Sequence, residues 1–157
     1  MRVMKWIVAV GLVGVSPRMA IAAETPDHCK AGEKRVFSCK TEKKDKVLSL
    51  CLNGSTLYYR FGQLSKVELE YPSGKLVNES AYSLFKRRRW GWKWGDVEEV
   101  SFTVGANTFT VSGARGDGSA ASVVVTQKER EIVNISCLGE ADELWSRLDK
   151  VLPASVE

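Results

Sequence analysis

The residues best suited to chemistry lie in one stretch of ten, Lys86 to Gly95, which holds five positive charges and three of the five tryptophans. In an extended chain, successive side chains point to opposite faces, so the three indoles would line one side. Indoles stack on sugar rings or bases, and cations neutralise phosphate or carboxylate. The stretch therefore predicts a cationic, tryptophan-rich binding ridge made of Arg87, Arg88, Arg89, Trp90, Trp92, Lys93 and Trp94.

The same stretch has a structural interpretation. It could be a β-hairpin whose tryptophans fill a core or shield a sheet edge, with the arginines lying along them. Against this, three adjacent cations are seldom needed for packing. Both interpretations stay open, and the solvent exposure of Trp90, Trp92 and Trp94 would separate them.

A second candidate segment is the glycine-rich run from Gly113 to Gly118, which follows a strand expected over residues 107–112. It contains Arg115-Gly116-Asp117, the tripeptide that integrins recognise in extracellular ligands. Glycine and aspartate are also ordinary turn residues, and three residues are a weak motif. The run lacks the Lys-Ser/Thr end of a phosphate-binding loop. We interpret it as an exposed loop.

Groups that could perform catalysis are few. His28 is the single histidine, and its place beside Cys29 in the N-terminal lead suggests a surface residue rather than a catalytic base. Carboxylate pairs occur at Glu68 with Glu70 and at Glu98-Glu99, but the first pair alternates with apolar residues as a solvated strand face does. The sequence predicts no enzyme, no cofactor and no metal site.

Residues 1–23 predict a secretory signal peptide that is cleaved. Arg2 and Lys5 precede an apolar run over residues 6–15, and small residues follow at 20–23. At about 1.5 Å per residue the run is too short for a hydrocarbon layer of ~30 Å, so no membrane span is expected after cleavage. The mature chain, 24–157, is expected to be one domain in the periplasm or secreted.

Cleavage would also change the charge. The signal carries three of the 23 basic residues and none of the 19 acidic ones, so the net charge would fall from +4 to +1. A nearly neutral chain does not favour nucleic acid as a partner.

Four cysteines follow the signal, at positions 29, 39, 51 and 137. An even number in an exported chain predicts two disulfides with three possible pairings. We lean towards Cys29–Cys51 and Cys39–Cys137, because the second closes the long loop that ties the two ends of the chain together.

The elements that must position these residues are mostly strands. In Lys66 to Tyr71, apolar and charged residues alternate with a period of two. Eight or nine such segments are separated by connections too short for parallel crossovers, which predicts an antiparallel meander that forms a barrel or a sandwich. Glu140 to Val151 has apolar residues at helical spacing and predicts one C-terminal α-helix.

Much of the mature chain carries a set of short motifs: Cys29, Val36-Phe-Ser-Cys39, Lys46-Val-Leu-Ser-Leu-Cys51, Tyr58-Tyr-Arg-Phe-Gly62, Val67-Glu-Leu-Glu-Tyr-Pro72 and Val100-Ser-Phe102. This pattern resembles a group of small exported proteins of Gram-negative bacteria with no assigned activity. The resemblance implies a periplasmic location and no mechanism.

Ser112-Gly113-Ala114-Arg115 follows a predicted strand and is similar to part of the Ser-Gly-x-x-Tyr loop of bacterial periplasmic lysozyme inhibitors. That resemblance implies a small disulfide-linked β-protein that inserts this loop into the lysozyme cleft. The tyrosine of the family pattern is replaced here by Gly116.

These observations lead to one main expectation. The chain is expected to be a non-enzymatic periplasmic binding protein that engages an envelope polysaccharide such as peptidoglycan or lipopolysaccharide, or a protein partner. The contacts would come from the ridge or from Ser112, Gly113 and Arg115. The alternative is an inhibitor or immunity protein that binds a lysozyme-like or toxin hydrolase.

Overall fold

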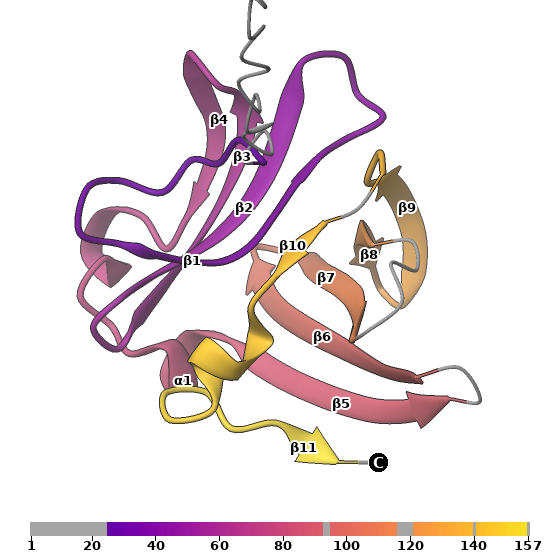
Figure 1. Cartoon of the computed structure of the whole chain (residues 1–157). Coiled ribbons are helices and arrows are strands. Elements are labelled where there is room, and N and C mark those ends of the chain that lie inside the picture. Colours follow the sequence, from indigo (N-terminus) through magenta and orange to yellow (C-terminus); the bar gives the residue numbers. More distant parts are fainter. Residues whose placement is uncertain (1–24, 93–94, 116–120, 140, 157) are drawn as a thin grey trace, which may run out of the picture.

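Two facing β-sheets make up the computed structural model, which describes residues 25–92, 95–115, 121–139 and 141–156 (Figure 1). The first sheet has the strand order β10-β1-β2-β3-β4 and the second has the order β11-β5-β6-β7-β8-β9. Within each sheet, strands β1 to β9 pair with the adjacent strands in antiparallel fashion, while the short β11 runs parallel to β5. The mainly β prediction is confirmed, and its form is the sandwich.

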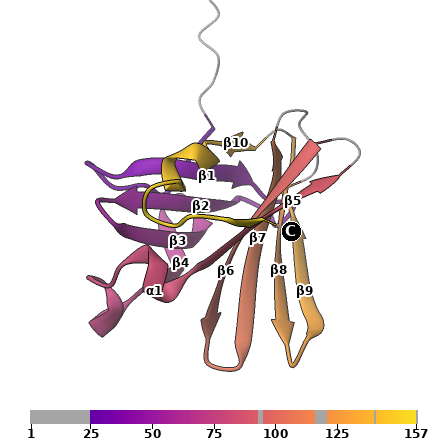
Figure 2. The same ribbon diagram turned by 90° about the horizontal axis from the view of Figure 1, so that it is seen from below.

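The strands of the first sheet are β1 (Lys34–Lys40), β2 (Lys46–Asn53), β3 (Thr56–Gln63), β4 (Lys66–Tyr71) and β10 (Asp142–Glu143). Those of the second are β5 (Lys86–Trp92), β6 (Gly95–Val104), β7 (Asn107–Arg115), β8 (Ser122–Gln127), β9 (Arg130–Ser136) and β11 (Ser155–Val156). Two short helices, η1 (Gly74–Leu76) and α1 (Ala81–Leu84), connect the sheets. In Figure 2 the strands of the two sheets cross steeply.

An aromatic cluster fills the space between the sheets. Tyr71 at the end of β4 stacks on Phe102 of β6, with ring centroids 4.5 Å apart, and Phe102 stacks in turn on Phe109 of β7 at 5.0 Å. Tyr59 and Phe85 pack against the same rings. Such contacts contribute beyond the burial of area alone, so this cluster fixes how one sheet lies on the other.

The C-terminal segment differs from the predicted α-helix over residues 140–151. Its described part forms β10, which pairs with β1, and then the 3-10 helix η2 (Trp145–Leu148). The backbone N–H of Leu144 donates to the carbonyl of Val36 in β1. Residues expected in the first turns of the helix are therefore hydrogen-bonded to the first sheet instead. With three residues per turn, Trp145 and Leu148 point the same way, and both are buried.

Both disulfides have the predicted pairing. Cys29–Cys51 ties the N-terminal segment to β2, and Cys39–Cys137 ties β1 to the residue that follows β9. An isolated bridge between Thr41 and Cys137 joins the two sheets at the same corner. Two disulfides indicate an oxidising compartment and therefore export. Within the described residues, no helix has the length and apolar character needed to cross a membrane.

Candidate functional site

Arg87 lies in the interior of the protein. Its Nε and Nη2 donate to the two carboxylate oxygens of Glu98 at 2.9 and 3.0 Å, and neither side chain has exposed surface. Its Nη1 donates to Asp149 at 2.8 Å and to the carbonyl of Leu152 at 3.2 Å. The prediction that Arg87 belongs to a binding surface is therefore wrong, because its donors hold the C-terminal segment against the sheet.

The next two arginines of β5 are also paired. Arg88 donates to Glu99 through Nη2 at 2.7 Å, and Arg89 donates to Glu98 through Nε at 2.7 Å. The hydrogen bond to Glu98 raises the pKa of Arg89, with further contributions from nearby carboxylates. Three arginines thus share three carboxylates, those of Glu98, Glu99 and Asp149, so this part of the ridge carries little net charge.

The strand register explains the pairing. In the β5–β6 hairpin, Arg88 lies opposite Glu99 and Arg89 lies opposite Glu98. Cross-strand partners have neighbouring side chains, so opposite charges at these positions attract. The adjacent acidic pair one strand later was the sequence signal for this arrangement.

The tryptophan half of the ridge is only partly visible. Trp90 is half-buried in β5. Trp92 is the last residue of that strand, and only the backbone of Trp92 is described. Lys93 and Trp94 lie outside the described residues. The exposure of the indoles at 92 and 94 stays a prediction.

The predicted loop at Ser112 and Gly113 is instead the interior of β7. Gly113 is buried opposite Glu98, and the Ser112 hydroxyl lies 3.2 Å from that of Ser122 on β8. These two residues are therefore sheet positions and cannot form an inserted loop. Arg115 ends the strand, and Gly116 and Asp117 lie outside the described residues.

The structure does bring the ends of the two candidate segments together. Trp92 of β5 pairs with Gly95, the first residue of β6, and the next residue, Asp96, pairs with Arg115 of β7. The backbone positions of Trp92 and Arg115 therefore lie on either side of one strand end. We call these four positions the sheet tip.

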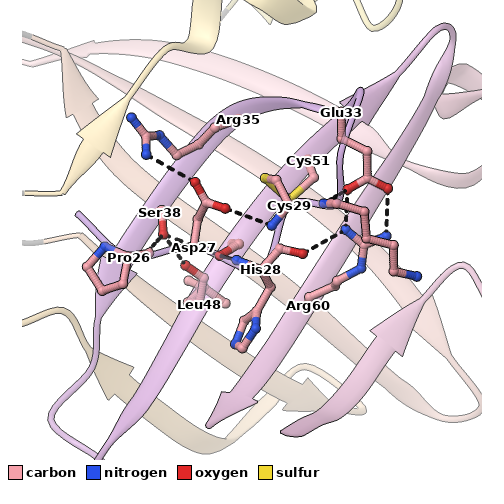
Figure 3. The surroundings of a disulfide bond; sticks show 12 residues. Pro26, Asp27, His28, Cys29, Glu33, Arg35, Ser38, Leu48, Cys51 and Arg60 are labelled. Atoms are coloured by element: carbon pink, nitrogen blue, oxygen red, sulfur yellow. Dashed lines mark hydrogen bonds and ion pairs between the residues drawn. A yellow bond between two sulfur atoms is a disulfide. The ribbon is translucent and has the colours of Figure 1, made fainter. Parts of the chain in front are cut away.

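A second buried cluster surrounds the Cys29–Cys51 disulfide (Figure 3). The guanidinium of Arg60 donates to the carboxylates of Glu33 and Glu70, at 2.9 Å and 2.7 Å, and to the carbonyl of His28 at 3.1 Å. His28 is buried, contrary to the predicted surface position, and its Nε2 donates to the carbonyl of Gly62 at 3.2 Å. This cluster holds the N-terminal segment on the outer face of the first sheet.

The carboxylates of this cluster are held in the charged form. Burial acts to raise the pKa of Glu33 and Glu70, but hydrogen bonds from Arg60 and its charge outweigh burial and lower both. Both side chains are therefore acceptors near neutral pH and not general acids. Glu68, the other carboxylate considered on β4, forms an ion pair with Lys46 at 2.7 Å.

Cys29, Glu33 and Cys51 each place a sulfur or carboxylate oxygen within 4.8 Å of the others, a spacing that could hold a metal ion. The two sulfurs are joined in the disulfide, however, and Glu33 is engaged by Arg60. Metal binding at cysteine requires a thiolate, so this group does not suit a metal in the oxidised protein.

Of the open cavities that the described residues line, two lie beside β1 and β6, away from the sheet tip. One, of about 610 Å³, sits at the β1–β2 turn and is lined by side chains of both charges, including Lys40, Glu42, Lys44 and Asp45, beside Leu64 and Leu138. The other, of about 330 Å³, lies between α1 and the far end of β6. The mixed charges of the first favour no single ligand class.

Comparison with protein-family models, with curated proteins and with solved structures found no match to this chain.

Proposed function

We propose that this chain is an exported, non-enzymatic binding protein of the bacterial envelope that engages peptidoglycan, lipopolysaccharide or a protein partner through the sheet tip. The observation that carries the proposal is the register that places Trp92 and Arg115 on either side of the Gly95-Asp96 strand end. Because Gly95 and Asp96 are consecutive in β6, this register places Trp92 and Arg115 on opposite faces of the strand end. A partner that binds the tip would meet an aromatic residue type, suited to a sugar ring, on one face and a basic residue type, suited to an acidic group, on the other.

The ion pairs of β5 support this proposal by holding the strands in place, whereas the sequence predicts that the arginines themselves contact the partner. Arg87, Glu98 and Asp149 fix β5 to β6 and to the C-terminal segment, so the strands that present the tip are held in place. A site on rigid strands loses less conformational entropy when it binds. The arginines would thus position the binding residues without making contact themselves.

The test is a titration of the full mature chain against peptidoglycan, lipopolysaccharide and c-type lysozyme. A double variant, Trp92→Ala with Arg115→Ala, should lose at least roughly tenfold in affinity for the true partner, as expected for two binding anchors. The matched control, Tyr82→Ala with Lys44→Ala, removes one exposed aromatic and one exposed cation elsewhere and should bind normally. Equal binding by all three proteins would refute a site at the tip.

The second candidate function is inhibition of a lysozyme-like or toxin hydrolase. One observation favours it: Arg115, the last residue of the segment similar to the inhibitor loop, ends β7 at the sheet tip. Stoichiometric 1:1 inhibition of a hydrolase that weakens on Arg115→Ala would support this function. Binding to purified peptidoglycan with no inhibition of any hydrolase would favour the first proposal instead.

A further inference from the structure

The cavity between α1 and the far end of β6 is built by a mismatch in strand length. Pairing between β5 and β6 begins at Lys86 opposite Ser101, whereas β6 continues to Val104. Residues 102–104 therefore have β7 on one side and no strand from β5 on the other. A space of about 330 Å³ occupies this notch, which is within the size range of small-ligand pockets.

Strand register also decides which side chains meet in the notch. Lys86 and Ser101 are cross-strand partners, and so are Thr103 and Thr108, whose hydroxyl oxygens lie 3.3 Å apart. Because Ser101 and Thr103 are two residues apart in β6, all four side chains lie on the same face. This face therefore offers three hydroxyl groups beside one ammonium group.

The remaining walls are apolar or polar but not acidic. Tyr71 and Phe102 border the inner side of the notch but are almost fully buried, and Phe102 is stacked between Tyr71 and Phe109. Ser83 and Leu84 of α1 close the side. Burial raises the pKa of Tyr71, so its hydroxyl keeps its proton. Among the described residues that line the cavity, Lys86 is the one charged side chain, and none of the others could form an ion pair with it.

Each component suits one class of ligand. Side-chain hydroxyls both donate and accept hydrogen bonds, as the hydroxyls of a sugar do. An ammonium group with no acidic neighbour in the lining favours a carboxylate. We propose that this notch is a binding site for an acidic sugar, a single pyranose ring that carries a carboxylate.

This site is independent of the sheet tip. Gly95 begins β6 at the tip and Val104 ends it beside the notch, so the two sites lie at opposite ends of one strand. The acidic-sugar site can therefore be correct or wrong whatever binds at the tip.

The experiment is an NMR titration of the mature chain with D-glucuronate, with methyl glucoside and acetate as separate arms. Glucuronate should shift the amide signals of Lys86 and residues 101–103 and should bind more tightly than either of the other two. Lys86→Met should weaken glucuronate binding roughly tenfold, the loss expected for one hydrogen bond to a charged group. Thr108→Val, which keeps the side-chain shape, should weaken it as well.

Two controls complete the design. Lys66→Met removes an exposed lysine of the first sheet. The double variant of Trp92 and Arg115 alters the sheet tip and leaves the notch unchanged. Both variants should bind glucuronate like the unmodified chain. No glucuronate binding, or equal losses in Lys86→Met and Lys66→Met, would overturn the proposal. So would acetate shifting the same amides with equal affinity, because the notch would then be a carboxylate site with no preference for a sugar.

Discussion

Arg87 and Glu98 form an ion pair with two hydrogen bonds in which neither side chain has exposed surface. Arg60 and Glu33 form a second such pair in the other sheet, again almost fully buried. Each arginine also holds a terminal segment: Arg87 bonds to Asp149 and Leu152, and Arg60 bonds to the carbonyl of His28. The two sheets thus hold the segments around residue 28 and around residues 149–152 in the same chemical way.

The first prediction concerns the Arg87–Glu98 pair. Removing one partner leaves the other charge buried without compensation, which typically costs about 3–5 kcal/mol. Glu98→Gln should therefore lower the free energy of unfolding by an amount in this range, measured by urea denaturation. Glu99→Gln, which breaks the exposed pair with Arg88, should cost less than about 1 kcal/mol. Equal costs would show that burial of the Arg87 pair has no energetic weight.

The second prediction is a pH dependence from Glu33. Arg60 lowers the pKa of Glu33 in the folded chain below its ordinary value of 4.5. The stabilisation is therefore fully present above pH 4.5 and is lost as the pH falls through the folded pKa. Unfolding free energies measured between pH 7 and pH 3 should fall with acidification.

Glu33→Gln is the matched variant for this measurement. It cannot titrate, so part of the acid-induced loss should disappear, and at pH 7 the variant should be less stable by about 2 kcal/mol because a hydrogen bond to a charged group is weakened. A variant that matches the unmodified chain at every pH would contradict the role given to this pair.

The third prediction compares the two disulfides. Cys39–Cys137 spans 98 residues and Cys29–Cys51 spans 22, so the longer loop constrains the unfolded chain more strongly. Replacing the first pair by serines should cost about 1 kcal/mol more than replacing the second, in the loop-entropy model. Urea denaturation of the two double-serine variants without reductant measures this difference. The reverse order would mean that native contacts near Cys29 outweigh loop entropy.

Much of the strand pattern could be predicted because its signals are local. Alternation in Lys66 to Tyr71 and the short connections specify antiparallel strands wherever those strands pack. Of the three possible disulfide pairings, the one favoured from the sequence is confirmed, and its Cys39–Cys137 bond joins an early strand to a residue after a late one. These features need no knowledge of how the sheets face each other.

The errors all concern properties that depend on tertiary contacts. The charges of Arg87 to Arg89 look available in the sequence, and only the register with Glu98 and Glu99 shows that they are paired. Ser112 and Gly113 look like the start of a loop because glycine ends strands, but pairing with β6 and β8 extends β7 to Arg115. Local propensity was overridden in both places by the neighbouring strands.

The last prediction tests why the C-terminal segment is not an α-helix. Trp145 packs its ring against Phe37 of β1, with centroids 5.3 Å apart, and is almost fully buried. If this packing holds the 3-10 turn in place, Trp145→Ala should cost about 3–5 kcal/mol, as the loss of a large buried side chain does. Ser146→Ala changes an exposed position of the same turn and raises helix propensity, and it should change stability by less than about 0.5 kcal/mol. The two explanations are packing of Trp145 and local helix propensity, and urea unfolding curves of both variants decide between them. A clear stabilisation by Ser146→Ala with a small loss for Trp145→Ala would mean that local propensity controls the segment.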